Sequence, residues 1–368
     1  MSRRVSPDRI LLIVVLILVL GGFLIFSSAS LGLLAREGAR FSSVAFNQFL
    51  FGIVGGFAAL SVISSIHYRT WRKYAFYIFL ATLGLTSLVF VPGIGLEHGG
   101  AVRWISIGGF SFQPAELLKI GFIVYMATWL SGMHTHMHTF TKGTMPFLGI
   151  LAVVGAIMLL QPDTDTFAIM ATSAVAMFIT AGGRLRDVGV MFLSAVVLLT
   201  ALAFTRPYIM DRLTTFIDPS VDPLGSSYQI QQSLIAIGSG GVGGRGFGQS
   251  IQKFEYLPEP IGDSIFAVAS EEFGFIGSTF LILLFVAFTF RGFRVATHAP
   301  DLFGMLLVVG FITLITLQAF LNIAAMLSLA PLSGLPLPFI SHGGTALLAT
   351  LAAIGVVLNV SKYQKKRV

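Results

Sequence analysis

Apolar stretches close to the length of a membrane span recur along almost all of this 368-residue chain. About 20 such residues in a helix match the hydrocarbon core of a bilayer. Backbone groups find no water partner in lipid, so a spanning segment must be a helix or part of a closed barrel. The alternating pattern of barrel strands is absent, and only 11% of the residues are charged. The sequence therefore predicts an all-α integral membrane protein.

Hydropathy indicates about ten spans. They are expected at residues 10–29, 47–66, 74–92, 114–131, 146–161, 165–181, 187–205, 264–290, 302–328 and 343–361. The first span has no small-residue cleavage site after it and is expected to be retained. We interpret residues 1–368 as a single polytopic membrane domain, with a long loop at 206–263 between spans seven and eight.

Positive charge is distributed unequally between the two sets of span ends. One set carries Arg3, Arg4, Arg9, Arg69, Arg72, Lys73, Lys142, Arg184, Arg186, Arg291, Arg294, Lys362, Lys365, Lys366 and Arg367. The short loops of the other set carry only Arg36, Arg40 and Arg103. The positive-inside rule then predicts both termini in the cytoplasm and the long loop outside. The net charge of +7 is explained by topology, and no nucleic-acid partner is expected.

Charged side chains from several chain regions are expected at the outer membrane edge. They are Arg103, Glu116, Lys119, Asp163, Asp165, Glu259, Asp263, Glu271 and Glu272. Any one of them alone reads as a helix cap or an interfacial residue; Asp163, for example, could be the N-cap of span six. An uncompensated charge inside a span costs about 2.5–3.5 kcal/mol, so their convergence favours a functional site. The chain has no cysteine, which excludes disulfides and thiolate chemistry.

Two irregular segments lie on the same expected side. Residues 228–237 have the pattern of a short helix that Gly238 would end, and a glycine-rich run follows to Gly248. This run contains a G-x-G-x-x-G pattern without the βαβ context of a dinucleotide site, so we interpret it as flexible loop backbone. The segment 331–344 has three prolines and three glycines between two spans. Irregular backbone at membrane depth must line a polar cavity or be buried in protein, so we expect it to be part of the same site.

Seven stretches resemble the SEDS family of bacterial cell-wall polymerases (shape, elongation, division and sporulation) over nearly the whole chain. They are Arg103-Trp with Phe112-Gln-Pro-Ala-Glu-Leu-Leu-Lys119, Gln161-Pro-Asp163, Tyr228-Gln-Ile-Gln-Gln-Ser-Leu-Ile-Ala-Ile-Gly238, Gln252-Lys253, Tyr256-Leu-Pro-Glu259, Asp263-Ser-Ile-Phe-Ala-Val268 before Glu271-Glu272, and Leu337-Pro-Phe-Ile-Ser-His-Gly-Gly344. The Gln252-Lys and Tyr256-Leu-Pro-Glu forms are more similar to the division member FtsW than to the elongation member RodA.

The resemblance implies ten helices, cytoplasmic termini and an outward-facing site in the cytoplasmic membrane, at the division septum. It implies a peptidoglycan glycosyltransferase that polymerises lipid II and releases undecaprenyl diphosphate. The implied partners are a class B penicillin-binding protein, other division membrane proteins and membrane lipids. Asp263 matches the essential aspartate of the family. Substrate-binding positions are expected at Arg103, Glu116, Lys119, Asp163, Arg245, Glu259, Ser341 and His342.

The chain departs from the family pattern at three places close to these residues. Ile261-Gly262 replaces His-Thr before the aspartate, Thr164-Asp165-Thr166 replaces Phe-Gly-Thr or Leu-Gly-Thr, and Ser341-His-Gly-Gly-Thr345 replaces Ser-Tyr-Gly-Gly-Ser. The aspartates themselves are retained, so the departures concern the polarity of the site.

The implied reaction joins a sugar 4-hydroxyl to an anomeric carbon and expels a diphosphate. We expect Asp263 to act as the base, and Lys119, Arg103, Arg212 or Arg245 to stabilise the leaving anion. A divalent ion (Mg or Mn) held by Asp163 and Glu259 is the alternative; no other cofactor is expected. Two other classes of function remain open: a lipid II flippase and a non-catalytic scaffold of the division machinery.

Overall fold

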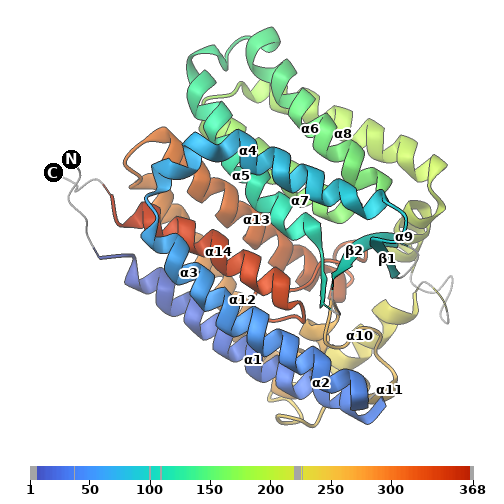
Figure 1. Ribbon diagram of the computed structural model, residues 1–368. Helices are drawn as coiled ribbons and strands as arrows, with labels where there is room; N and C mark the ends of the chain where they lie inside the picture. Colours follow the sequence, from blue (N-terminus) through green and yellow to red (C-terminus); the bar gives the residue numbers. More distant parts are fainter. Residues whose placement is uncertain are drawn as a thin grey trace.

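The computed structural model describes residues 6–36, 38–98, 101–107, 110–218, 225 and 227–364, which form one bundle of long helices (Figure 1). Each expected span coincides with helical structure. The spans are α1 (Arg9–Arg36), the run α2 (Gly38–Asn47), η1 (Gln48–Gly55, a π-helix) and α3 (Gly56–Ser65), then α4 (Tyr68–Ser87), α5 (Pro114–Met133), α6 (Met145–Leu160), α7 (Thr164–Thr180), α8 (Leu185–Thr205), α12 (Ile265–Thr297), α13 (Leu302–Met326) and α14 (Gly344–Ser361). The expected fold class is confirmed.

Short 3-10 or π-helical segments join some of these spans: η2 (Leu88–Phe90), η3 (His134–His136) and η4 (Phe140–Thr144). By length and composition, eight helical segments in the described residues are able to cross a membrane, and the shorter α7 is apolar as well.

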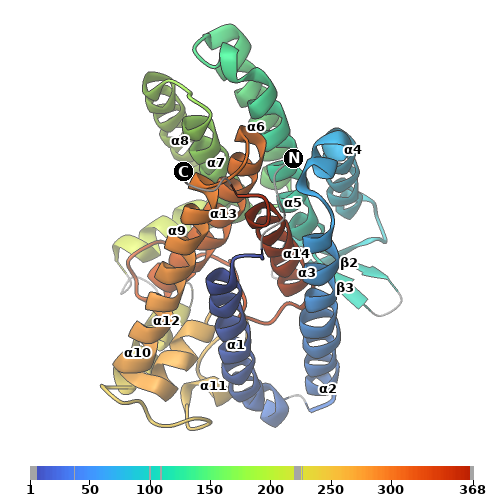
Figure 2. The same ribbon diagram turned by 90° about the vertical axis from the view of Figure 1, so that its left-hand side faces the viewer.

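Helices α13 and α14 form the centre of the bundle, and α8 lies at its edge (Figure 2). The most apolar windows of α13 and α14 are 72% and 78% buried, against 11% for α8. Phe192 and Phe204 on α8 are 71% and 79% exposed. Such exposure would be costly in water but costs nothing against lipid tails, which are as apolar as the side chains.

The two termini lie at one end of the bundle, and the strands and helices α9 to α11 lie toward the other end (Figures 1 and 2). This placement agrees with an even number of crossings and puts the long loop on the side away from the termini. Of the residues used for the orientation, Arg3, Arg4, Lys365, Lys366 and Arg367 and the side chains of Arg36 and Arg40 lie outside the described residues.

A small antiparallel sheet, which the sequence analysis did not anticipate, follows α4. Its strands are β1 (Gly95–His98), β2 (Ala101–Ile107) and β3 (Phe110–Phe112), in the order β1-β2-β3. Alternate residues of a strand share a face, so Arg103 lies on the face of the buried Ala101 and Ile105. The sheet thereby directs an arginine inward.

The long loop contains three helices, of which one was expected. They are α9 (Pro207–Ile217), α10 (Tyr228–Ser239) and α11 (Gln252–Glu255). The end expected at Gly238 was wrong by one residue, because α10 continues through Gly238 to Ser239. Residues 219–224 and 226 of this loop lie outside the described residues.

The glycine-rich run is inserted into a break in α12. At Gly274 the helix has a φ of 65° and a ψ of −163°. The amides of Phe275 and Ile276 donate to the carbonyls of Gly241 and Val242 (2.9 and 3.2 Å) instead of to their own helix. The carbonyls of Glu271 and Glu272, which those two amides would normally bind, accept from the amides of Arg245 and Gly246 (both 3.0 Å).

Glycine is required in this insertion because the two backbones are in contact. A Cβ atom on Gly244 would lie 2.1 Å from the carbonyl oxygen of Glu272, and one on Gly240 would lie 2.1 Å from that of Ser270. The interpretation of this run as flexible backbone was therefore wrong. Its glycines permit close approach of two chain segments whose backbone groups are paired.

Candidate functional site

Asp263 lies in a tight turn just before the first residue of α12. The carbonyl oxygen of Glu259, which has a φ of 45°, accepts from the amides of Gly262 (3.0 Å) and Ser264 (3.2 Å). The Asp263 side chain is partly buried, whereas that of Glu259 is exposed. Within the described part of the chain, Asp263 forms no salt bridge. The turn therefore presents a carboxylate without a cation in contact with it.

Burial and, to a smaller extent, the nearby charge of Glu259 raise the pKa of Asp263 to about 7. A hydrogen bond from Gln229 and the positive charge of Arg212 oppose the rise. A carboxyl group with this pKa exchanges its proton near neutral pH. That property suits a general base.

A cavity of about 320 Å³ opens between the long loop and Leu332 of the segment 331–344. Its lining includes Arg212, Tyr228, Gln229, Pro258 and Leu332. Gln229 also donates to the hydroxyl of Ser264 (3.0 Å), and Ser264 directly follows Asp263 in the chain. The cavity is therefore adjacent to Asp263 and combines an arginine, an amide and an aromatic ring.

Arg212 is held at this cavity by Asp165, from the first turn of α7. The Arg212 Nη1 to Asp165 Oδ2 distance is 2.7 Å, and the same oxygen accepts from the Gly334 amide at 3.2 Å. The pair is about one-quarter exposed, so Arg212 is positioned without being shielded from a ligand.

Glu116 and Lys119 form a buried ion pair on one face of α5. The Lys119 Nζ atom lies 2.8 Å from Glu116 Oε1, and it also donates to Gln318 Oε1 on α13 at 3.0 Å. Both charged side chains are about 7% exposed or less. Their spacing of three residues places them on the same face of the helix.

Asp163 and Arg103 meet at the turn between α6 and α7. Asp163 caps α7 by accepting from the Thr166 amide (3.4 Å), and Gln113 donates to its other oxygen (3.3 Å). Arg103 donates to the carbonyls of Gln161 (3.1 Å) and Pro162. Burial raises the pKa of Asp163, and the charge of Arg103 opposes that rise. The capping interpretation of Asp163 was thus correct locally, and Arg103 organises the same turn.

Ser341 and His342 contact the chain directly before Asp263. The Ser341 hydroxyl donates to the Gly262 carbonyl at 2.6 Å, and the His342 amide donates to the Ile261 carbonyl at 2.7 Å. The His342 ring stacks on Phe26 of α1. The segment 331–344 therefore packs against the chain that carries Asp263, through contacts to the protein's own backbone; its role in binding a substrate stays a prediction.

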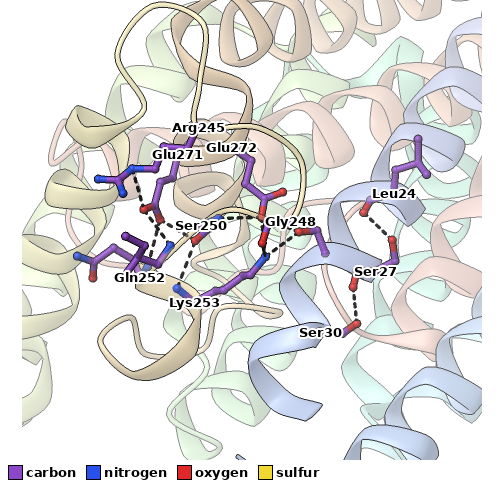
Figure 3. A network of polar contacts seen from close by, with 12 residues as sticks. Leu24, Ser27, Ser30, Arg245, Gly248, Ser250, Gln252, Lys253, Glu271 and Glu272 are labelled. Carbon is purple, nitrogen blue, oxygen red and sulfur yellow. Dashed lines mark hydrogen bonds and ion pairs between the residues drawn. The ribbon is translucent and has the colours of Figure 1, made fainter. Parts of the chain in front are cut away.

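Glu271, Glu272 and Arg245 form a second polar cluster together with Ser250 and Lys253 (Figure 3). Lys253 Nζ lies 2.7 Å from Glu272 Oε1, and both side chains are 1% exposed or less. Ser28 of α1 donates to the same oxygen at 2.6 Å. Arg245 Nε lies 3.4 Å from Glu271 Oε1. The structure therefore does not bring Arg245 together with Asp263 as the sequence analysis expected.

The described residues contain no group of three His, Asp or Glu side chains placed to hold a metal ion. Asp163 is occupied by Gln113 and the α7 amides, and Glu259 is exposed on another turn. Asp163 and Glu259 therefore do not fit a shared metal site.

Sequence reasoning did not identify Gln229, Gln318 and Asn322 as members of the site. Gln318 and Asn322 are buried amides four residues apart on α13, an otherwise strongly apolar helix. This spacing was the available signal, since residues four apart share a helix face.

A family model described as "Cell cycle protein", for FtsW, RodA and SpoVE, matches residues 8–366. Stage V sporulation protein E of Bacillus subtilis is 40% identical over 367 residues and covers 99% of each chain. A probable peptidoglycan glycosyltransferase FtsW of Geobacter sp. is 39% identical over 361 residues, covering 98% of each.

Solved structures are similar as well. A chain of a peptidoglycan synthase complex has a TM-score of 0.80 and 27% identity, covering 98% of this chain and all of that one. RodA of Thermus thermophilus has a TM-score of 0.70 and 26% identity over 98% of this chain and 99% of its own. The chain therefore belongs to the FtsW/RodA/SpoVE (SEDS) family of multi-pass membrane proteins and is FtsW-like.

Proposed function

We propose that this protein is a peptidoglycan glycosyltransferase that polymerises lipid II at the outer face of the cytoplasmic membrane during cell division, with release of undecaprenyl diphosphate. One observation carries the proposal: Asp263, with a pKa of about 7 and no salt bridge within the described residues, is bound by Gln229, which lines a cavity together with Arg212. Relatives that match 98% of the chain carry the name of this activity.

In this reaction the acceptor sugar hydroxyl attacks the anomeric carbon of the donor. Asp263 takes the hydroxyl proton as the new C–O bond forms and the bond to the diphosphate breaks. The diphosphate leaves as an anion, so cations rather than a second acid assist its departure. Arg212 is the cation best placed for this role, because it lines the cavity and its charge is felt by Asp263. Lys119 and Arg103 contribute positive charge from further within the bundle.

The distribution of charge supports a polymerase over a flippase. Arg103 is on β2 and Arg212 is on α9, and both elements lie toward the end of the bundle away from the termini (Figure 1). Arg103 donates to the turn that precedes Asp163, and Asp263 ends the loop that contains α9. A flippase needs a polar path to both membrane faces. The carboxylates near the other end, the buried Asp8 and the partly exposed Asp301, are paired with Arg291 and Arg69.

We further propose that the termini are cytoplasmic, that the protein acts at the septum, and that it assembles with a class B penicillin-binding protein and other division membrane proteins. The charge distribution supports the orientation. The similar chain of known structure comes from work on coordinated polymerisation and crosslinking by a synthase complex, which supports a crosslinking partner.

The test is glycan-chain formation from purified lipid II by the protein reconstituted with its crosslinking partner. Wild type should form polymer and Asp263→Asn should not. Asp301→Asn is the matched control, because Asp301 caps α13 far from the site and asparagine caps equally well; it should remain active. Polymer from Asp263→Asn would remove this residue from the chemistry. No polymer from wild type, together with lipid II translocation in vesicles, would support the flippase.

A further inference from the structure

Three successive peptide carbonyls of the segment that carries Asp263 are each bound by a different donor. The Ile261 carbonyl accepts from the His342 amide (2.7 Å), the Gly262 carbonyl from the Ser341 hydroxyl (2.6 Å), and the Asp263 carbonyl from the Asn322 side-chain amide (2.7 Å). The donors come from α13 and from the irregular segment that follows it. The backbone of Asp263 is thus held by a region about 60 to 80 residues away in the chain.

Asn322 uses both of its amide hydrogens in this arrangement. Its Nδ2 atom donates to the Asp263 carbonyl and to the Leu335 carbonyl (2.8 Å), and its side chain is completely buried. Buried carbonyls that lose their donors are costly. A single side chain therefore joins the turn of Asp263 to the proline-rich segment.

Gln318, one helical turn earlier on α13, makes the corresponding connection to the charged pair on α5. Its Nε2 atom donates to the Pro336 carbonyl at 2.8 Å, and its Oε1 atom accepts from Lys119 Nζ at 3.0 Å. Asn322 and Gln318 lie on one face of α13 because they are four residues apart. They bind the consecutive carbonyls 335 and 336.

We propose that Asn322 and Gln318 are positioning residues. This amide pair on α13 fixes the position of the Asp263 carboxylate relative to the Lys119 ammonium group. This rests on the proposed glycosyltransferase function, with Asp263 as its base. Neither amide contacts substrate. Asn322 holds the peptide of Asp263, Gln318 holds Lys119, and the peptide between carbonyls 335 and 336 connects them. Misplacement of a reacting group by about 1 Å can lower the rate roughly 100-fold. Residues that fix the position of Asp263 therefore affect the rate strongly.

The chain offers a matched control in Asn359 on α14. It too is buried, and its side chain also makes two backbone hydrogen bonds, from the Tyr68 amide (2.8 Å) and to the Ser64 carbonyl (2.7 Å). These contacts lie at the end of the bundle that holds the termini. Asn322→Leu and Asn359→Leu therefore remove the same chemistry from two different places, one connected to Asp263 and one not.

The experiment compares Asn322→Leu, Gln318→Leu, Asn359→Leu and Asp263→Asn in the lipid II polymerisation assay, per amount of folded complex. We expect Asn322→Leu to lower kcat by about 10- to 100-fold with KM within about twofold, and Asn359→Leu to leave both within about twofold. The double variant Asn322→Leu with Gln318→Leu should lose less than the product of the single losses, because the two residues act as one unit.

The pH profile supplies a readout that loss of folded protein does not change. When Asn322 is removed, the turn of Asp263 opens to water, and the desolvation that raises its pKa is reduced. The acidic limb of the kcat/KM profile should then move to lower pH in Asn322→Leu and remain in place in Asn359→Leu. If Asn322→Leu does not fold, Ser341→Ala removes one of the three carbonyl donors at smaller cost and should show the same shift.

Two results would overturn the proposal, and they can be told apart. The first result is that Asn322→Leu and Asn359→Leu lose kcat equally and share the same acidic limb of the kcat/KM profile, while Asp263→Asn is inactive. This result would exclude the positioning role and leave the proposed function intact. Full activity of Asp263→Asn would remove both, because the amide pair would then have no base to position.

Discussion

Around Asp263 the backbone is held and the partly buried carboxylate has no ion-pair partner within the described residues, whereas around Glu272 the side chain itself is paired and enclosed. Three donors bind the carbonyls 261, 262 and 263, yet the described residues place no cation in contact with the Asp263 carboxylate. Glu272, nine residues later in the chain, is bound by Lys253 and Ser28 and is 1% exposed. Two acidic sites at the start of the same helix thus have different uses, and the pairing of the carboxylate distinguishes them.

The largest effect should come from Asp263→Asn. We expect polymerisation to fall by about 10²–10⁴-fold, the usual contribution of a general base. The thermal stability of this variant, in contrast, should not fall. A carboxyl group whose pKa is raised in the folded state stabilises the protein at low pH and loses that contribution as the pH rises through about 7.

Above pH 7, Asp263→Asn should therefore be at least as stable as wild type, as measured by the melting temperature in detergent at pH 8. A clear drop in that temperature would mean that Asp263 has a structural role like that of Glu272, and the comparison would fail.

Lys253→Met should give the largest loss of stability. It leaves the Glu272 carboxylate buried without its cation, which typically costs about 3–5 kcal/mol. Equilibrium unfolding in detergent measures this loss. The double variant with Glu272→Gln should recover a substantial part of it, because no charge then remains buried; equal losses for the single and double variants would argue against the ion pair as the cause.

Gly244→Ala should destabilise the insertion into α12 by about 1–3 kcal/mol, the usual cost of overpacking, since its Cβ atom would meet the Glu272 carbonyl. Gly238→Ala, in the same glycine-rich run, is the control. Gly238 lies inside α10 with open space around its Cβ position, and alanine is favoured there by up to about 1 kcal/mol. The two changes should alter the free energy of unfolding with opposite signs. Equal losses of stability would contradict close packing as the reason for glycine at position 244.

The smallest effect concerns the acidity of Asp263. The kcat/KM for polymerisation should rise with pH along a limb centred at about pH 7, because only the ionised carboxylate accepts a proton. Glu259→Gln removes a negative charge that raises this pKa, so the limb should move to lower pH. Glu255→Gln, an exposed change in the same loop, should leave it in place. A profile that is flat between pH 5 and 8 would exclude Asp263 as the titrating base.

The helices could be predicted from the sequence because a bilayer imposes their length and composition. The charged pair on α5 and the turn of Asp163 could also be located, since both depend on spacing within one helix or one turn. Glu271 and Glu272 were grouped with Asp263 because they are close to it along α12, and Arg245 because it lies in the outer loop. Glu271 is instead bound by Arg245 and Ser250, and Glu272 by Lys253 and Ser28, contacts that no local pattern encodes.

Asn322 and Gln318 were overlooked for a related reason. An uncharged amide inside an apolar helix is tolerated energetically when it finds a partner, and those partners are backbone carbonyls that leave no trace in residue type. The β-sheet was missed because its strands have between three and seven residues, too few for a clear alternation.

The break in α12 also affects how the protein is made. The glycine-rich run precedes α12 in the chain, so it has been synthesised before the helix that receives it. Until the two meet, the amides of Phe275 and Ile276 and the carbonyls of Glu271 and Glu272 lack their final partners. Lipid does not satisfy such groups, so the first turns of α12 can settle in the bilayer only after the loop has docked. Membrane insertion of this span and folding of the preceding loop are thereby a single coupled step in biogenesis.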